Sequence, residues 1–155
     1  MNEITIRPAR PGEAEALSAL CRRSKAHWGY DDTFLRQSEA SLTISERLIA
    51  SGLVVVAEDA DNRIAGLASL EPLESGKFDL AHLFVEPAAI GRNVGSALFR
   101  AIADLAGVLG GTRLSVLSDP NAAGFYERMG AYRVGDAPSD AIPGRTLPLL
   151  EYALS

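Results

Sequence analysis

One stretch of the chain decides the fold, and it reads LFVEPAAIGRNVGS over residues 83–96. Its first residues end an apolar strand, Pro87 stops that strand, and Gly91 and Gly95 lead into a new helix. A loop of this kind presents several backbone N–H groups at the positive end of a helix, which suits a pyrophosphate. Two glycines before a helix also serve merely to turn the chain, so the stretch alone names no ligand.

Strand and helix patterns alternate along the rest of the chain. Residues 77–86 predict a central strand, because bulky apolar side chains occupy both of its faces. A Thr43…Glu46 capping box predicts the start of one helix, and Asp119-Pro120 predicts the start of another. The expected elements are strand 2–7, a helix after Pro11-Gly12, helices 33–40 and 43–51, strands 53–58, 63–70 and 77–86, a helix after Gly95, strand 112–118, a helix ended by Gly130, and strands 132–135 and 146–154.

The composition is that of an ordinary globular protein, with 155 residues, 47% hydrophobic and 23% charged. This length suits a single domain over residues 1–155. No tract is apolar enough to cross a bilayer and the N-terminus shows no secretory pattern, so we expect a soluble, cytoplasmic protein without a membrane partner. The net charge of -5 argues against a nucleic-acid partner and fits a neutral or cationic substrate.

Cysteine and histidine are too few to indicate a disulfide or a metal centre. Cys21 is the single cysteine and lies at helical spacing from Leu17, so we interpret it as a packing residue. His27 and His82 are far apart and lack ligand-type spacing with acidic residues. We therefore expect no metal.

Two common nucleotide-binding patterns do not fit the loop at residues 91–96. A P-loop requires Gly-Lys followed by Ser or Thr, and the corresponding residues are Val94-Gly95-Ser96. A Rossmann fingerprint requires its glycine loop after the first strand of the domain, whereas this loop follows several strands.

The chain resembles the GNAT family of N-acetyltransferases over nearly its whole length. The family's acetyl-CoA signature, R/Q-x-x-G-x-G/A, falls on residues 90–95 after Val85-Glu86-Pro87, with Ile90 at the Arg/Gln position and Asn93 at a Gly position. Asparagine tolerates the left-handed backbone conformation better than most residues, so the loop can still form. A second family motif, N-x-x-x-x-F-Y-x-x-x-G, falls on residues 121–130.

The resemblance implies a mixed α/β fold, with a central, mostly antiparallel twisted sheet flanked by helices. It also implies transfer of an acetyl group from acetyl-CoA, as co-substrate, to the primary amine of a small molecule by direct attack in a ternary complex. In the family the strand ending at Val85 splays from its neighbour and offers backbone groups to the pantetheine. The residues that the resemblance assigns to acetyl-CoA are Leu83, Phe84, Val85, Ile90, Gly91, Arg92, Asn93, Val94, Gly95, Ser96, Asn121 and Tyr126.

Acetyl transfer needs a proton for the departing thiolate and a base for the amine. Tyr126 is the candidate acid, because a phenol with a pKa of about 10 keeps its proton at neutral pH and can protonate a thiolate of pKa about 8.5. Tyr126 can also be interpreted as an aromatic side chain packed in the core. Glu71, Asp79 and His82 are the candidate bases; His82 has the best-suited intrinsic pKa, and its alternation with apolar neighbours equally fits a packed histidine. A bulge in its strand would change the face that His82 shows.

The acceptor side rests on an aromatic loop that resembles a segment of some bacterial GNAT sequences. Trp28 and Tyr30 can hold an apolar or cationic acceptor, with Asp31 or Asp32 attracting its ammonium group. Asp79 is a further candidate substrate residue. Trp28 equally fits a residue that covers the edge of the core. Arg145 can bind an acceptor carboxylate or can simply be solvated.

Two other functions are weighed against the small-molecule transferase, namely a non-catalytic acyl-CoA-binding sensor and a protein or peptide N-acetyltransferase. Tyr126 argues against the sensor, and the aromatic loop favours a closed pocket over a peptide groove. The sequence identifies neither the acceptor nor the base, and both a monomer and a homodimer fit it.

Overall fold

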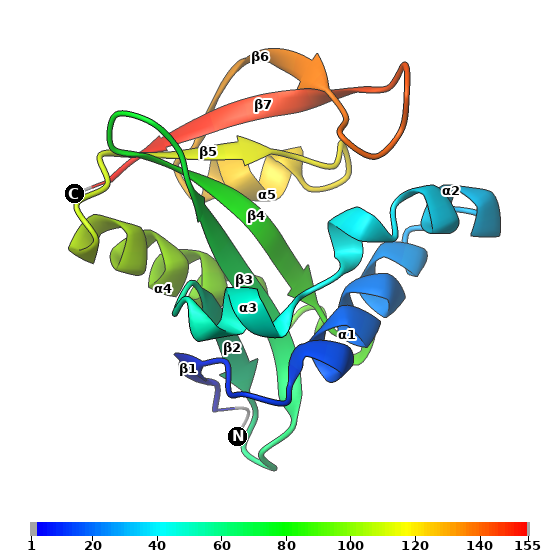
Figure 1. Ribbon diagram of the computed structural model, residues 1–155, viewed down its shortest axis with the longest axis vertical. Helices are drawn as coiled ribbons and strands as arrows, with labels where there is room; N and C mark the ends of the chain where they lie inside the picture. Colours follow the sequence, from blue (N-terminus) through cyan, green and yellow to red (C-terminus); the bar gives the residue numbers. More distant parts are fainter. Residues whose placement is uncertain (1–2, 155) are drawn as a thin grey trace.

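A seven-stranded twisted sheet runs through the computed structural model, which describes residues 3–154, with helices on both sides of the sheet (Figure 1). The strand order is β1-β2-β3-β4-β5-β7-β6, so β4 is the central strand, as the sequence predicts. The elements are β1 (Thr5–Pro8), α1 (Ala14–Ala26), α2 (Asp32–Gln37), η1 (Ala40–Leu42), α3 (Glu46–Ala50), β2 (Val54–Glu58), β3 (Ile64–Pro72), β4 (Lys77–Val85), η2 (Pro87–Ala89), α4 (Val94–Val108), β5 (Arg113–Leu117), α5 (Ala123–Arg128), β6 (Tyr132–Pro138) and β7 (Thr146–Ala153).

The pairing confirms a mixed, mostly antiparallel sheet. Five of the six neighbouring strand pairs are antiparallel, and β4 and β5 form the one parallel pair among the described residues. A parallel pair needs a crossover connection, and α4 supplies it between β4 and β5. The loop that decides the fold therefore opens this crossover.

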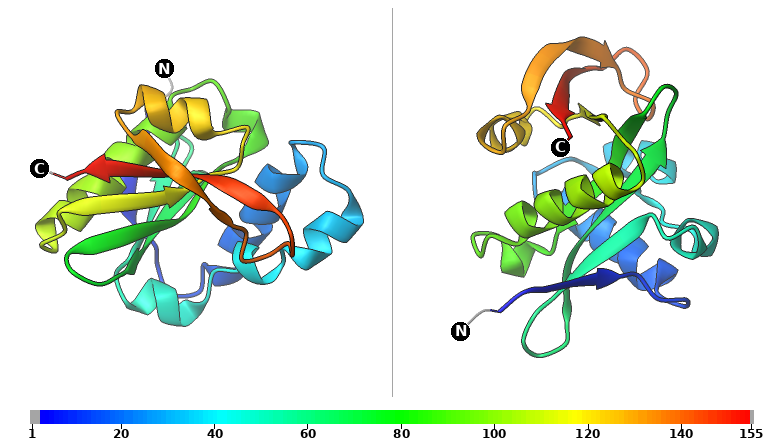
Figure 2. Two further views of the ribbon diagram at one scale, coloured as in Figure 1. Left: turned by 90° about the horizontal axis from the view of Figure 1, so that it is seen from above. Right: turned by 90° about the vertical axis from the view of Figure 1, so that its left-hand side faces the viewer.

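Two apolar cores lie on opposite faces of the sheet (Figure 2). One face is covered by α4 and α5, whose Leu98, Phe99 and Tyr126 are buried there. The other face is covered by α1, η1 and α3, and it contains the fully buried Leu17 and Cys21. Cys21 packs as the sequence predicts, and burial raises the pKa of its thiol to about 12.

Two of the helix starts expected from the sequence are wrong. Ser45, not Thr43, caps α3, because its side chain accepts a hydrogen bond from the Leu48 N–H at 3.0 Å. The Glu46 carboxylate instead accepts from the N–H groups of Gly12 and Ala14 and so ties α3 to the start of α1. A long-range partner has replaced the local capping box.

The second error concerns Asp119-Pro120, which does not open α5. The helix begins at Ala123, and the Asp119 Oδ1 atom accepts from the Asn121 N–H at 2.9 Å in a tight turn. The other Asp119 oxygen is held by residues far away in the sequence, described below. Gly130 ends the helix at a φ of 108°, as expected.

Other expected boundaries shift by a few residues. The helix expected at 33–40 ends at Gln37 and is followed by the separate turn η1, the helix expected at 43–51 covers only Glu46–Ala50, β3 extends to Pro72 and β6 to Pro138. Asn2, expected in the first strand, lies outside the described residues. Within residues 3–154, no helix combines the length and apolar character that a membrane span requires.

A bulge in β4 changes which face its side chains show. Leu70 pairs with Leu80 and Ser69 pairs with His82, which leaves Ala81 without a partner residue. Leu80 and His82 therefore point to opposite faces, although they are two residues apart. Leu80 is buried under α4, whereas His82 faces η1.

Beyond the bulge, β4 and β5 turn away from each other, which we call the strand divergence (Figure 1). Their pairing stops at Asp79 and Ser115, although β4 continues to Val85 and β5 to Leu117. The stretch of β4 after Asp79 thus has a sheet partner only on the β3 side. The splay implied by the family resemblance is present.

Candidate functional site

The strand divergence leaves backbone hydrogen-bonding groups of β4 unpaired. The Glu86 N–H donates to the Ala65 carbonyl of β3 at 2.8 Å. Because consecutive residues of a strand direct their N–H and C=O groups to alternate sides, Val85 and Leu83 direct theirs away from β3, toward the divergence. No described strand pairs with them there. An extended ligand can use these groups as an added strand would.

The loop before α4 collects backbone donors at the positive end of that helix. Gly91 has a φ of 91°, and Asn93 adopts the left-handed conformation at φ 62° and ψ 21°, as its residue type allows. The Ala97 N–H donates to the Asn93 carbonyl at 3.1 Å. Within residues 3–154, the N–H groups of residues 93–96 donate to no protein acceptor. This loop therefore has the donors and the helix dipole that an anionic phosphate group needs.

The side chains of the same stretch contribute unequally. Val94 is 1% exposed, so it offers only its backbone to a ligand. Phe84 packs against the core on the α1 side and directs its backbone groups toward β3, so the geometry does not favour it as a ligand contact. Ile90 is 48% exposed, and Arg92 is exposed. A Cβ atom on Gly95 would meet the Phe125 ring at 3.4 Å, so α4 approaches α5 closely at this point.

Tyr126 lies at the junction of α4 and α5. Its ring packs against Phe125 at 5.2 Å and Phe99 at 6.0 Å between centroids, and the residue is 7% exposed. Its hydroxyl has no hydrogen-bond partner among the described residues and is not fully enclosed by protein. Burial, and then the negative charges of Asp119 and Asp79, raise the pKa of the phenol. Tyr126 thus keeps its proton well above neutral pH and can donate it.

Asp79 lies where β4 and β5 part, as the last residue of β4 that pairs with β5. Burial, and then the charges of Glu71 and Asp140, raise its pKa to about 6. Glu71 is its pairing partner on β3 and is exposed. At neutral pH the Asp79 carboxylate is mostly ionised, and it is more basic than an ordinary aspartate. It can accept a proton.

His82 holds η1 against the sheet through both ring nitrogens. Its Nδ1 atom lies 2.6 Å from the Ser69 hydroxyl and its Nε2 atom 3.0 Å from the Ser41 carbonyl. A carbonyl only accepts, so Nε2 carries the hydrogen and Nδ1 accepts from Ser69. Burial lowers the pKa of the imidazole. With neither nitrogen free, the geometry favours the packed interpretation of His82 over the catalytic one.

The structure separates the residues of the aromatic loop. Trp28 is 49% exposed, and Asp31 caps α2 by accepting from the Phe34 N–H at 2.8 Å. Tyr30 instead turns inward and stacks on Phe34, with 4.0 Å between ring centroids. A shallow cavity of about 470 Å³ lies beside this stack and is lined by Gly29, Tyr30, Asp31, Thr33, Phe34 and Gln37.

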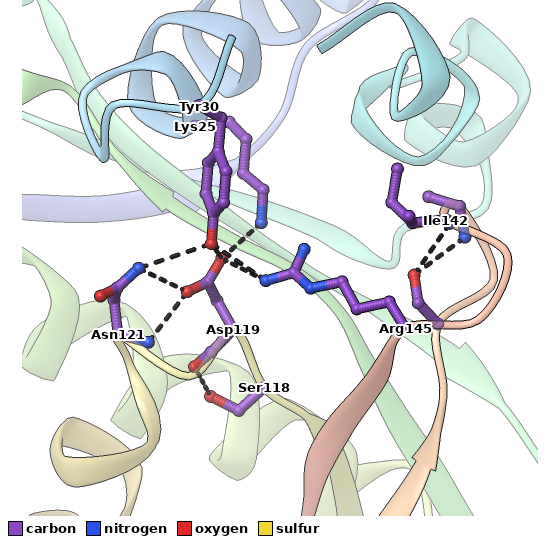
Figure 3. Close-up of polar contacts among 9 residues, drawn as sticks. Lys25, Tyr30, Ser118, Asp119, Asn121, Ile142 and Arg145 are labelled. Carbon is purple, nitrogen blue, oxygen red and sulfur yellow. Dashed lines mark hydrogen bonds and ion pairs between the residues drawn. The ribbon is translucent and has the colours of Figure 1, made fainter. Parts of the chain in front are cut away.

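Four segments meet at the carboxylate of Asp119 (Figure 3). Its Oδ2 atom accepts from Lys25 at 2.6 Å and from the Tyr30 hydroxyl at 2.8 Å, while Asn121 Nδ2 donates to Oδ1 at 2.9 Å. Arg145 donates to the Tyr30 oxygen at 3.0 Å. Burial opposes ionisation of Asp119, but the hydrogen bond from Lys25 and its other donors prevail and lower its pKa. We call these five residues the Asp119 cluster.

The sequence pointed to Tyr30, Asn121 and Arg145 but missed Lys25 and Asp119 as site residues. Lys25 lies 94 positions from Asp119, and no local pattern marks either residue for the other. The Asp119-Pro120 pair is typical of a helix start, and it does not mark Asp119 as a site residue. Among residues 3–154, no group of three or more His, Cys, Asp and Glu side chains is placed to hold a metal ion.

Comparisons with known proteins agree with this fold. The sequence model of the Acetyltransferase (GNAT) domain matches residues 50–130, more than half of the chain, and this range contains the strand divergence, the α4 loop and Tyr126. No curated protein sequence gives a significant match.

Three solved structures illustrate the likeness. The GCN5-related N-acetyltransferase from Rhodopseudomonas palustris is 26% identical with a TM-score of 0.76, covering 97% of this chain and 95% of that one. N-acetylglutamate synthase from Neisseria gonorrhoeae, solved with coenzyme A and N-acetyl-glutamate, is 26% identical with a TM-score of 0.71; the match covers 99% of this chain but 35% of that one. PaiA N-acetyltransferase from Thermoplasma acidophilum, solved with coenzyme A, has the same fold at 16% identity, with a TM-score of 0.78 and coverage of 97% and 99%.

The matched family range thus includes the unpaired edge of β4, the donor loop of α4 and the Tyr126 helix, and the matches to two of the fold neighbours cover 97% of this chain. The chain belongs to the GNAT family of acetyltransferases.

Proposed function

We propose that this protein transfers the acetyl group of acetyl-CoA to the primary amine of a small molecule. One observation carries the proposal: the unpaired edge of β4 begins after Asp79 and leads to the donor loop of α4, and α5, which carries Tyr126, packs against α4 at Gly95. These elements would supply donors for phosphates, backbone groups for an extended chain, a proton donor and a proton acceptor.

The residues present suit acetyl-CoA. The N–H groups of residues 93–96 would hold the pyrophosphate, and the backbone groups of Leu83 and Val85 would bind the amides of the pantetheine arm. Asn121 uses its amide nitrogen within the Asp119 cluster, so its Oδ1 atom is left to accept from the same arm. The N-acetylglutamate synthase structure, at 26% identity, contains coenzyme A and supports this assignment.

Acetyl-CoA supplies the acetyl group as a thioester when it is bound. The amine nitrogen forms the new bond to the carbonyl carbon, and the bond between that carbon and sulfur breaks. The Leu83 N–H polarises the carbonyl oxygen and stabilises the negative charge that develops on it. Asp79 accepts the proton lost by the amine, directly or through water, and Tyr126 donates a proton to the departing sulfur.

Asp79 is the base that the geometry supports best. Its pKa of about 6 leaves it ionised at neutral pH, and its charge raises the pKa of Tyr126, so the two groups lie within electrostatic range of each other. His82 has both nitrogens engaged and faces η1. Glu71 lies beside Asp79 and is exposed, and we propose that it raises the basicity of Asp79 rather than taking the proton itself.

A thiol-release assay tests the proposal. Purified protein is incubated with acetyl-CoA and a panel of small primary amines, and free CoA is measured as thiol while the product is identified by mass spectrometry. We expect thiol release that depends on the amine and yields the N-acetyl product. Tight binding of CoA without thiol release from any amine or peptide would contradict the proposal and favour a sensor. Acetylation of peptides alone would reassign the acceptor.

A further inference from the structure

Arg145 brings to the candidate site a guanidinium group whose donors are only partly used. Its Nη2 atom donates to the Tyr30 oxygen at 3.0 Å, while Nε and Nη1 have no hydrogen-bond partner among the described residues. The side chain is only 21% exposed. Half-buried guanidinium donors favour an acceptor such as a carboxylate, which can bind two of them side by side.

The loop that carries Arg145 is held in a fixed shape. The Ser139 N–H donates to the Arg145 carbonyl at 2.7 Å, and the Ser139 hydroxyl oxygen accepts from the N–H groups of Ala141 and Ile142. Tyr30 then fixes the guanidinium itself. The donors are therefore positioned before any ligand arrives, which lowers the entropic cost of binding.

The charges of the Asp119 cluster do not balance. Lys25 and Arg145 are both cations, and among the described residues Asp119 is the one carboxylate that contacts them, at 2.6 Å and 3.9 Å. The side chains of Lys25 and Asp119 are 16% and 13% exposed, and both cations also face the Tyr30 and Phe34 rings, at 4.9–5.6 Å from the ring centroids. The rings attract a cation but carry no net charge, so one positive charge is not matched by a carboxylate. An anion at this point would complete the charge balance.

The opposite end of the site is negative. Glu71 and Asp140 both raise the pKa of Asp79, so three carboxylates lie close enough to interact where β4 and β5 part. The Asp119 charge and the Asp79 charge both raise the pKa of the Tyr126 phenol, so both carboxylates lie within electrostatic range of it. The surroundings of Tyr126 thus include carboxylates at the strand divergence and an excess of positive charge in the Asp119 cluster.

We propose that the acceptor amine also carries a carboxylate, and that Arg145, with Lys25 beside it, binds this carboxylate through its Nε and Nη1 donors. The proposal rests on the proposed function, since it names the substrate class of the same site. The amine of such an acceptor faces Asp79 while its carboxylate faces Arg145. Tyr30 acts as a positioning residue, because it orients the guanidinium through its phenol oxygen.

Matched acceptor pairs test the proposal by activity. Each pair consists of an amino acid and its carboxamide. In some pairs three or more carbons separate the amine from the carboxylate or carboxamide, so that the amine pKa is nearly the same in both members of the pair. For the wild-type protein we expect kcat/KM to favour the carboxylate by about 10- to 100-fold, as charge-assisted hydrogen bonds do. Arg145→Gln should remove this preference and leave the carboxamide values within about twofold.

Two further variants control for charge and folding. Arg145→Lys keeps the charge but loses the planar pair of donors, so an intermediate preference is expected. Arg100→Gln removes an exposed arginine of α4, and it should leave the preference unchanged. An equal kcat/KM for both members of each pair in the wild type, or a preference that survives Arg145→Gln, would overturn the proposal. A preference for aminoalkylphosphonates tenfold above carboxylates would also overturn it, in favour of a phosphate-bearing acceptor.

A binding measurement separates this proposal from the proposed function. Trp28 is the single tryptophan and lies two residues from Tyr30, so its fluorescence can report acceptor binding in the presence of CoA. Carboxylates should bind about tenfold or more tightly than carboxamides, with the difference lost in Arg145→Gln. If this difference in binding is observed without thiol release, the result supports the carboxylate site and contradicts the transferase function. If thiol is released but carboxylates and carboxamides do not differ in binding or in kcat/KM, the result contradicts the carboxylate site and leaves the transferase function supported.

Discussion

Replacing Tyr126 by phenylalanine should separate catalysis from stability. The hydroxyl has no hydrogen-bond partner among the described residues, while the ring packs against Phe99 and Phe125 and stays in the variant. The free energy of unfolding should therefore change by no more than about 0.5 kcal/mol. The departing thiolate, in contrast, loses its proton donor, and kcat should fall about 100- to 10,000-fold. This loss corresponds to about 2.7 to 5.4 kcal/mol of activation free energy.

The assay compares the wild type, Tyr126→Phe and Tyr132→Phe in steady-state thiol release, CoA binding and urea unfolding. Tyr132 is 48% exposed on β6 and serves as the matched control, with kcat expected within twofold of the wild type. Because the pKa of Tyr126 is raised, the wild-type kcat should show no decline from loss of the acid up to about pH 9. A kcat within threefold of the wild type in Tyr126→Phe, with CoA affinity unchanged, would refute the role of the phenol.

Three other substitutions test the base, the donor loop and the sheet. Asp79→Asn should abolish the rise of kcat/KM with pH around pH 6. Burial and negative neighbours raise the pKa of Asp79 in the folded state from 3.8 to about 6, so the wild-type protein loses stability as pH rises through that pKa. The variant should therefore have a free energy of unfolding in urea about 2–3 kcal/mol higher than the wild type at pH 8, and little different at pH 4. Asn93→Ala should lose about 1–2 kcal/mol of unfolding free energy because of its left-handed backbone, while Asn93→Gly should not, and unchanged stability in both would contradict this view. Gly66→Ala should lower the free energy of unfolding by about 1–3 kcal/mol, since its Cβ would lie 2.8 Å from the Phe84 carbonyl oxygen. Gly135→Ala is the control: its Cβ would have no atom within 4 Å, so the free energy of unfolding should fall by less than about 0.5 kcal/mol in the same assay.

The order of elements was predictable because it depends on patterns within a few residues. The apolar strand before Pro87, the glycine loop and the helix that follows it are where the sequence places them, and the central position of β4 followed from apolar side chains on both faces. The left-handed conformation of Asn93 was also foreseen, because it depends on the residue's own backbone preference. Local capping patterns failed at Thr43 and Asp119. The Glu46 carboxylate accepts instead from backbone N–H groups at the start of α1, and an Asp119 oxygen accepts from the Lys25 side chain.

The sequence alone determined the family, the crossover unit with its donor loop, and the helix that carries Tyr126, since each is encoded in a continuous motif. Only the tertiary structure distinguishes the surroundings of the candidate bases. The bulge opposite Ser69 and Leu70 turns His82 toward η1, and the depth of burial and the neighbouring carboxylates give Asp79 its raised pKa. Only the folded chain joins Lys25 to Asp119 and Tyr30 to Arg145, pairs that are 94 and 115 positions apart. Register and long-range contact are properties of the assembled sheet, and no single segment contains them.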